Sequence, residues 1–303
     1  MPNSEPPPPA RVTGEPVPGF PIKFTWQTGD WFALFQKHVE LIQADIKRAV
    51  MGGRQVLYLS CPISSYGGSF STTNVEIALF TAQRLSMEFG SHFWFLNPAQ
   101  YQMESQLGLG LIRNHARELE LENPGRKVDV DKLMKQSPAS GGDYMRMWTR
   151  VLVEDDCGNF GGRFSAFYFI GAADMRKFFA NGETLNISAA VEQYFARKMA
   201  MDHDFSVYFT PPFTDPTGKT IAPADEQAEW TRRRDEFIRF YSLKASAAYS
   251  RGSHDEWNIW RLLNENRRAS ANWGLGEQLG GYYGGTQIEP QAAETPLSKG
   301  YAI

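Results

Sequence analysis

The stretch Val56-Leu57-Tyr58-Leu59-Ser60-Cys61-Pro62-Ile63 decides the fold class of this chain. It starts with a run of apolar residues, which is typical of a strand that is buried on both faces of a sheet. The small polar residues of Ser64 to Ser69 follow, and a helical pattern starts near Thr73. Open α/β sheets use such a strand, loop and helix to build ligand sites at the carboxyl ends of their strands.

The same alternation of apolar runs and helical patterns continues along the chain. We predict strands over Gln55–Cys61, His92–Leu96, Phe164–Ile170 and Phe205–Phe209. The periodicity predicts helices over residues 31–51, 73–89, 144–153, 189–201, 224–248 and 254–269. Strands that alternate with helices favour an α/β fold with a doubly wound, mostly parallel sheet and a helical C-terminal extension.

The domain organisation follows from composition. Residues 1–20 are rich in proline and predict a tail that is disordered or extended over the surface. We expect one α/β domain over residues 21–210 and a helical extension packed on it over residues 211–303. Residues 100–136 predict irregular helix inserted over one end of the sheet, and the glycine-rich tail from Gly274 predicts irregular structure.

Composition excludes several classes of function. The 303 residues carry a formal net charge of −3, so no basic field favours nucleic acid or an anionic membrane surface. No apolar run approaches the length of a membrane-spanning helix. Two cysteines cannot build a disulfide framework, which favours a reducing, cytoplasmic location. We find no motif for a metal or a redox cofactor, and the Asp202-His203-Asp204 cluster has no second histidine spaced for zinc.

Two carboxylates are candidates for chemistry. Glu192 falls near the start of the predicted helix after the third strand, where the helix dipole also favours an acid that has no function. Asp174 follows the end of that strand, so both acids should lie at the carboxyl edge of the sheet. Two carboxylates at one cleft suit cleavage of an N- or O-glycosidic bond. Ser188 and its small neighbours would leave room for a substrate.

These motifs resemble the nucleoside 2-deoxyribosyltransferase family over roughly residues 55–209. The strand Leu57 to Ile63 is similar to the family's first strand and loop, which typically reads Tyr-Leu-Ala-Gly-Pro-hydrophobic, with Cys61 in place of the glycine. Further matches, in the family's order along the chain, are Asn97-Pro98, Trp148, Asp174, and the small residues that lead to Glu192 and Ala196. The resemblance implies a flavodoxin-like fold.

The resemblance also implies a function at the N-glycosidic bond of a nucleoside or nucleotide, by hydrolysis or by glycosyl transfer. Glu192 would attack the anomeric carbon, Tyr58 would orient its carboxylate, and Asp174 would contact the sugar or base. Residues expected to line the substrate are Ser60, Pro62, Ser64, Gly67, Gly68, Asn97 and Ser188. The alternative is a nucleotide-binding sensor or interaction module on the same fold that has no catalytic turnover.

Other residues have simpler interpretations beside a functional one. Glu76 fits a capping box with Thr73, although the loop before it could bind a phosphate at the helix start. Cys61 reads as a buried structural cysteine rather than a nucleophile. Trp257 and Trp260 lie one helical turn apart, which favours core packing, with a homo-oligomer interface as the alternative.

Overall fold

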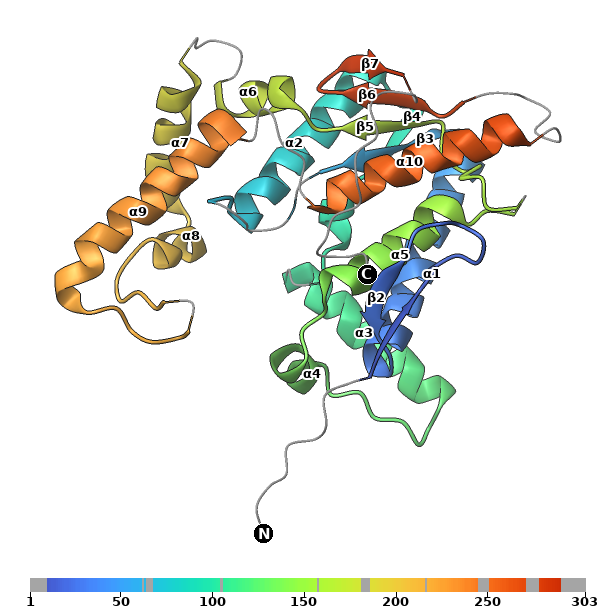
Figure 1. Cartoon of the computed structure of the whole chain (residues 1–303), viewed down its shortest axis with the longest axis horizontal. Helices are drawn as coiled ribbons and strands as arrows, with labels where there is room; N and C mark the ends of the chain where they lie inside the picture. The colour runs from blue at the N-terminus through green and yellow to red at the C-terminus, as the bar shows by residue number, and fades with distance from the viewer. Residues whose placement is uncertain are drawn as a thin grey trace.

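The computed structural model describes residues 10–61, 63, 68–103, 106–156, 158–180, 186–215, 217–244, 251–270 and 278–289. Figure 1 shows a central sheet with helices packed on both of its faces. The strands of this sheet are β3 (Gln55–Ser60), β4 (Phe93–Leu96), β5 (Ala166–Phe169), β6 (Gly280–Tyr283) and β7 (Thr286–Ile288). They lie in the order β4-β3-β5-β6-β7, and all neighbours are parallel except the antiparallel pair β6 and β7.

The sheet is doubly wound, as predicted. Strand β3 lies between β4 and β5. The chain therefore places β4 on one side of β3 and then returns to place β5 on the other side. The helices α1 (Asp30–Met51), α5 (Gly141–Val153) and α10 (Arg251–Ala269) pack on one face, and α2 (Ser71–Phe89) packs on the other. This flavodoxin-like order creates a topological switch point at the carboxyl ends of β3 and β5, where such sheets bind ligands.

The residues of β3 explain its central place. Val56 and Tyr58 belong to the core that α1, α5 and α10 cover, whereas Leu57 and Leu59 belong to the core on the α2 face. All four are buried, because side chains of a strand alternate between the two faces of its sheet. The prediction of a strand that is buried on both faces is confirmed.

Several predicted helices are confirmed with small shifts of their ends. Helix α1 starts one residue early, α2 starts at Ser71, and α5 starts at Gly141 behind a capping box of Ser140 and Asp143. The last predicted helices correspond to α7 (Ile187–Met201), α9 (Glu226–Arg239) and α10, with the 3-10 turn η2 (Pro223–Asp225) before α9 and a π-helical turn η3 (Phe240–Lys244) after it.

The predicted strand Phe205–Phe209 is wrong, because this segment forms the short helix α8 (His203–Tyr208). The Asp202 side chain accepts a hydrogen bond from the Phe205 backbone N–H and so starts the helix. Phe205 and Phe209, four residues apart, both pack on Phe195. The segment after β5, for which we predicted no helix, contains the helix α6 (Ala172–Ala180).

The irregular tail expected from Gly274 is also wrong, because its described residues form β6 and β7 and complete the sheet. A side chain at Gly281 would place its Cβ 2.2 Å from Cζ2 of Trp260, so only glycine lets β6 lie this close to α10. The sheet therefore takes strands from both sides of residue 210. The boundary that we drew there stays a prediction.

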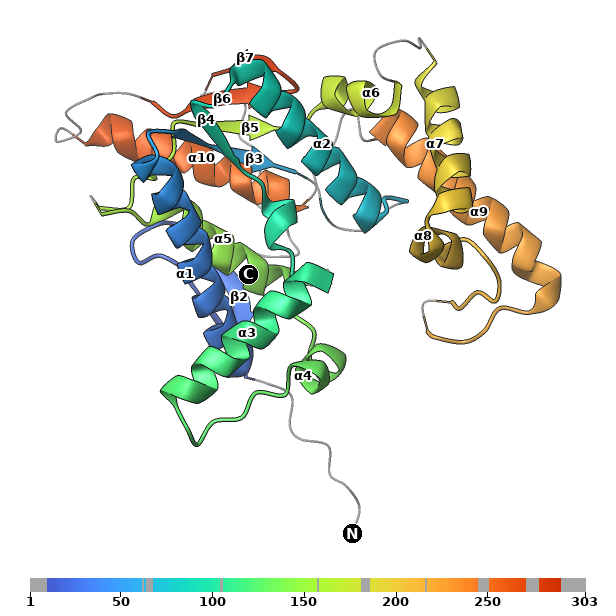
Figure 2. The ribbon, with the colours of Figure 1, turned by 180° about the vertical axis from the view of Figure 1, so that it is seen from behind.

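The N-terminal segment and residues 100–136 are more ordered than expected. The strands β1 (Arg11–Gly14) and β2 (Phe24–Gln27) form an antiparallel hairpin, and between them Val17 and Phe20 are buried in the core. Residues 1–9 lie outside the described residues. The 3-10 turn η1 (Pro98–Tyr101) leads to two regular helices, α3 (Gln106–Glu122) and α4 (Val130–Gln136). Helix α3 packs on α1 rather than over an end of the sheet, as Figure 2 shows from behind.

Candidate functional site

A buried carboxylate, Glu256, lies against the carboxyl half of β3. Its Oε1 accepts a hydrogen bond from the Tyr58 hydroxyl at 2.5 Å, and its Oε2 accepts one from the Ser60 hydroxyl at 2.5 Å. Glu256 is only 5% exposed. Tyr58 and Ser60 are two residues apart on the strand, so both side chains point to the face that α10 covers. We name these three residues the Glu256 site.

Helix α10 positions Glu256 through its aromatic face. Trp257 and Trp260 pack on Phe169 of β5, and their ring centroids lie 4.9 and 6.0 Å, respectively, from the centroid of the Phe169 ring. Glu256 lies four residues before Trp260 and therefore on the same side of the helix. The start of α10 lies beside the end of β3 that leads to α2 (Figure 1), which is the switch point of the sheet. The two tryptophans are buried as core residues, so the expectation of packing is confirmed.

The surroundings of Glu256 change its acidity. Burial raises the pKa of Glu256 to about 7, and the charge of Asp255 acts in the same direction, whereas the hydrogen bonds from Ser60 and Tyr58 favour the ionised form. A carboxyl group with such a pKa exchanges protons near neutral pH. This is the range in which a general acid or base is most effective.

Asn97 and Cys61 lie beside this site, at the carboxyl ends of β4 and β3. The Asn97 Oδ1 accepts a hydrogen bond from the Ala99 backbone N–H at 3.0 Å and faces the Cys61 sulfur at 3.9 Å. Asn97 is fully buried, yet its Nδ2 has no hydrogen-bond partner among the described residues. Burial and the charge of Glu256 raise the pKa of the Cys61 thiol, which agrees with a structural cysteine.

Asp174 lies at the carboxyl end of β5 as expected, but on the opposite face of the sheet from Glu256. Its oxygens accept hydrogen bonds from the Gly171 backbone N–H, the Tyr168 hydroxyl and the Arg84 guanidinium, at 2.9, 2.8 and 2.6 Å. Asp174 is 1% exposed. These contacts join α6 to β5 and α2, so the structure gives Asp174 a structural role at the sheet edge.

Glu192 does not meet Tyr58 or Asp174 in any contact between described residues. It lies on α7, which starts at Ile187, so Glu192 falls in the second turn of this helix. Its side chain is 51% exposed and lies 3.4 Å from Arg234 of α9. Ser188 and Glu192 do line one pocket, together with Asp235 and Ser242 across from them.

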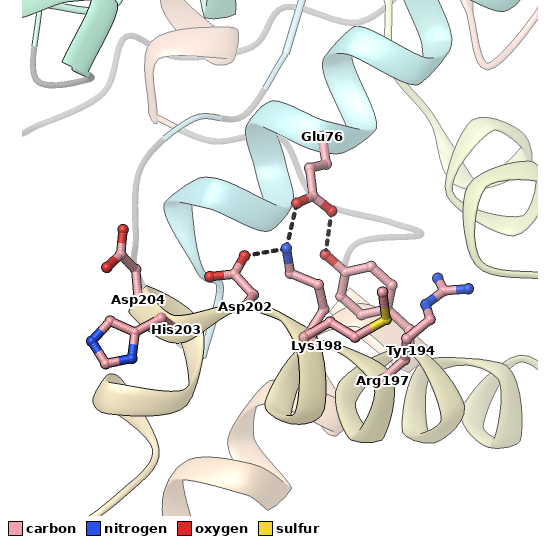
Figure 3. A pocket seen from close by; sticks show the side chains of 8 residues that line it. Glu76, Tyr194, Arg197, Lys198, Asp202, His203 and Asp204 are labelled. Atoms are coloured by element: carbon pink, nitrogen blue, oxygen red, sulfur yellow. Dashed lines mark hydrogen bonds and ion pairs between the residues drawn. The ribbon is translucent and has the colours of Figure 1, made fainter.

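The carboxylate of Glu76 links α2 to α7 through contacts with side chains of α7. Helix α2 has no side-chain cap, so the capping box expected for Glu76 is wrong. Its carboxylate accepts hydrogen bonds from the Tyr194 hydroxyl at 2.7 Å and from the Lys198 ammonium at 2.6 Å, and Lys198 also pairs with Asp202 (Figure 3). These contacts line a shallow polar pocket that His203 borders. The carboxylates of Glu76 and Asp202 are thus both paired with the Lys198 ammonium.

The remaining predicted site residues divide into two groups. Pro62, Ser64 and Gly67 lie outside the described residues. Gly68 is described, and its backbone approaches α9 so closely that a Cβ would lie 2.4 Å from the Glu236 carbonyl oxygen. The glycine at this position is therefore required by packing and by its positive φ of 100°.

The sequence reasoning missed Glu256. The available signal was its spacing, because an acid four residues before Trp260 lies on the helix face that the tryptophans mark as buried. Such an acid must find donors in the core, since a buried charge without partners is costly. In the described part of the chain, no three histidine, cysteine or acidic side chains are grouped to hold a metal, and no helix is long and apolar enough to span a bilayer.

Comparisons of the chain with models of protein families, with curated proteins and with solved structures gave no match.

Proposed function

We propose that this chain is an enzyme that acts at the N-glycosidic bond of a nucleoside or nucleotide, with Glu256 as its catalytic carboxylate. The observation that carries the proposal is a buried carboxyl group with a pKa of about 7 at the switch point of a flavodoxin-like sheet. The substrate class comes from the resemblance of residues 55–209. No metal or redox cofactor is part of the proposal.

The hydrogen bond of Tyr58 supports this choice of carboxylate. The resemblance expects the tyrosine of the first strand to orient the catalytic acid. Tyr58 donates its hydroxyl hydrogen bond to Glu256 at 2.5 Å, and not to Glu192. A carboxylate held by two hydroxyl donors keeps a fixed orientation, which is what attack on a sugar carbon requires.

In the proposed step, the ionised Glu256 carboxylate attacks the anomeric carbon or stabilises the positive charge that develops on the sugar. The bond between carbon and nitrogen breaks, and the base leaves with the electron pair and takes up a proton. Water or a second base then accepts the sugar. Asn97 offers an N–H donor at the neighbouring strand end for the substrate.

The experiment is an incubation of the full chain with nucleosides, nucleoside monophosphates and NAD, with the released base measured by chromatography. Glu256→Gln keeps the shape of the side chain and removes its acid, so we expect a rate loss of roughly 100-fold or more. Glu192→Gln is the matched control and should retain the rate. The parent's rate should also change with an inflection near the pKa of Glu256, at about pH 7.

Two outcomes would contradict the proposal. Loss of activity in Glu192→Gln but not in Glu256→Gln would return the catalytic role to Glu192. No base release from any compound would favour the second candidate, a nucleotide-binding module without turnover. The 5% exposure of Glu256, with both oxygens already bonded, favours that candidate, and nucleotide binding that survives Glu256→Gln would support it. A cytoplasmic location and a homo-oligomeric state stay predictions.

A further inference from the structure

The guanidinium of Arg146, on α5, packs against two aromatic rings. Its central carbon lies 4.0 Å from the centroid of the Phe32 ring of α1 and 5.3 Å from that of the Trp26 ring of β2. Arg146 is 6% exposed. Aromatic rings attract the charge of a guanidinium but leave the N–H groups in its plane for other partners.

The N–H groups of Arg146 have no partner among the described residues. None of its three nitrogens makes a hydrogen bond or ion pair there. The guanidinium therefore carries five N–H donors in a fixed plane that no described protein group uses.

The neighbouring acids make their hydrogen bonds with other groups. Asp143 accepts hydrogen bonds from the backbone N–H groups of Gln27 and Ser140, at 2.7 and 2.6 Å. Glu154 binds Arg150 through both of its oxygens. Burial, and then the charge of Arg150, lower the pKa of Arg146 to about 10, whereas the charges of Glu154 and Asp143 act in the opposite direction, so Arg146 stays positively charged at neutral pH.

Arg233 shows what a satisfied arginine of the same kind looks like. Its guanidinium also packs on two rings, those of Tyr208 and Phe213, at 4.9 and 4.5 Å. Its three nitrogens, however, all donate hydrogen bonds, to Glu229 and to the backbone oxygens of Tyr208 and Thr214. The aromatic contacts are thus the same in kind, and the use of the N–H groups differs.

We propose that Arg146 anchors a binding site for an oxyanion, either a carboxylate or a phosphate group, on the surface formed by α1, α5 and β2. Both groups accept two parallel hydrogen bonds from one guanidinium. Phe32, at 40% exposure, adds an apolar surface beside these donors, which suits a ligand with an apolar body. The site stands apart from Glu256 and does not rest on the proposed function.

The test follows the side-chain Nε–H signals of Arg146 and Arg233 by NMR in the full chain. The two signals are assigned from their loss in Arg146→Lys and Arg233→Lys, with near-UV circular dichroism to verify that each variant is folded. Inorganic phosphate and acetate are titrated separately, with sodium chloride used to hold the ionic strength constant. We expect a saturable shift of the Arg146 signal with a Kd of roughly millimolar, as one ion pair at a surface gives.

Each outcome decides the proposal. A saturable shift at Arg146 that Arg233 does not share supports the site, and the anion that acts at the lower concentration identifies its chemistry. An Arg146 signal that moves no more than the Arg233 signal with either anion overturns it. If Arg146→Lys does not fold, the Arg146 signal is assigned through the backbone of the parent protein, and the same two outcomes apply.

Discussion

Glu192 and Glu256 are both acids near the start of a helix, yet their surroundings in the fold are opposite. Glu192 lies 51% exposed against an arginine, whereas Glu256 lies 5% exposed between two hydroxyl donors. Water screens the charge of the first and weakens its ion pair with Arg234. The second depends on its protein partners for every hydrogen bond, so its protonation is tied to folding.

The largest difference between the two acids should appear in stability. Glu256→Ala removes a buried side chain and leaves the hydroxyls of Tyr58 and Ser60 without their partner, which should cost roughly 2–5 kcal/mol of unfolding free energy. Glu192→Ala should change it by no more than about 0.5 kcal/mol. Urea unfolding of both variants measures the two values. Equal losses would show that the burial of Glu256 has no energetic consequence.

The second difference concerns pH. The pKa of Glu256 rises from 4.5 to about 7 on folding, so its stabilising contribution is complete below pH 4.5 and is lost as the pH rises through 7. Over this range the parent should lose about 3 kcal/mol relative to Glu256→Gln. Unfolding free energies from pH 4 to 8 test this. Curves that stay parallel for the parent and Glu256→Gln would contradict it, and Glu192→Gln should track the parent.

A buried histidine sharpens the comparison because its effect has the opposite sign. His38 Nδ1 lies 3.1 Å from His115 Nε2, and its Nε2 lies 2.9 Å from the Tyr101 carbonyl oxygen. Burial lowers the pKa of His38 from 6.5 to about 4, and the nearby His115 acts in the same direction. Stability from a neutral His38 is therefore complete above pH 6.5 and is lost as the pH falls through 4.

His38→Gln should remove this loss, which amounts to about 3 kcal/mol at most. Its unfolding free energy should fall less than that of the parent between pH 6.5 and 4. The charged groups that face the pair from α1 and α3 are Lys37, Glu40 and Glu118, and they are unchanged in this variant. NMR titration of the His38 ring gives the pKa directly, and a midpoint near 6.5 would refute the prediction.

The smallest expected effect is the loss of either hydroxyl group that donates a hydrogen bond to Glu256. Tyr58→Phe and Ser60→Ala each remove one hydrogen bond to a carboxylate, which is worth about 1.5–3 kcal/mol when the acceptor is charged and about 1 kcal/mol when it is neutral. Each variant should therefore lose more stability at pH 8 than at pH 5. Unfolding at these two pH values measures the difference, and a loss that is independent of pH would mean that Glu256 does not ionise.

Much of the fold could be predicted from local pattern. The apolar run of β3, its Gly/Ser loop and the periodic helices α1, α2, α5 and α7 are encoded within windows of about twenty residues. The strands β6 and β7 could not be predicted in this way. Gly280 and Gly281 have no side chain that signals a strand, and what orders them is the contact with β5 and with Trp260.

The site was half predicted for the same reason. Tyr58, Ser60 and Asn97 follow from strand ends, which a sequence shows directly. Their partner Glu256 comes from a helix much later in the chain, 198 positions after Tyr58. Local pattern ranks Glu192 first because of its place after the third strand, and only the packing of α10 shows which acid the core encloses.

The late position of β6 has a consequence for how the protein is made. Strand β6 pairs with β5, although more than a hundred residues separate Phe169 from Gly280. During synthesis, β3, β4 and β5 leave the ribosome with one edge of the sheet and one face of β5 uncovered until α10 and β6 emerge. Such an exposed edge invites pairing with other chains. A chaperone that holds nascent chains should therefore engage this protein until β6 has emerged from the ribosome.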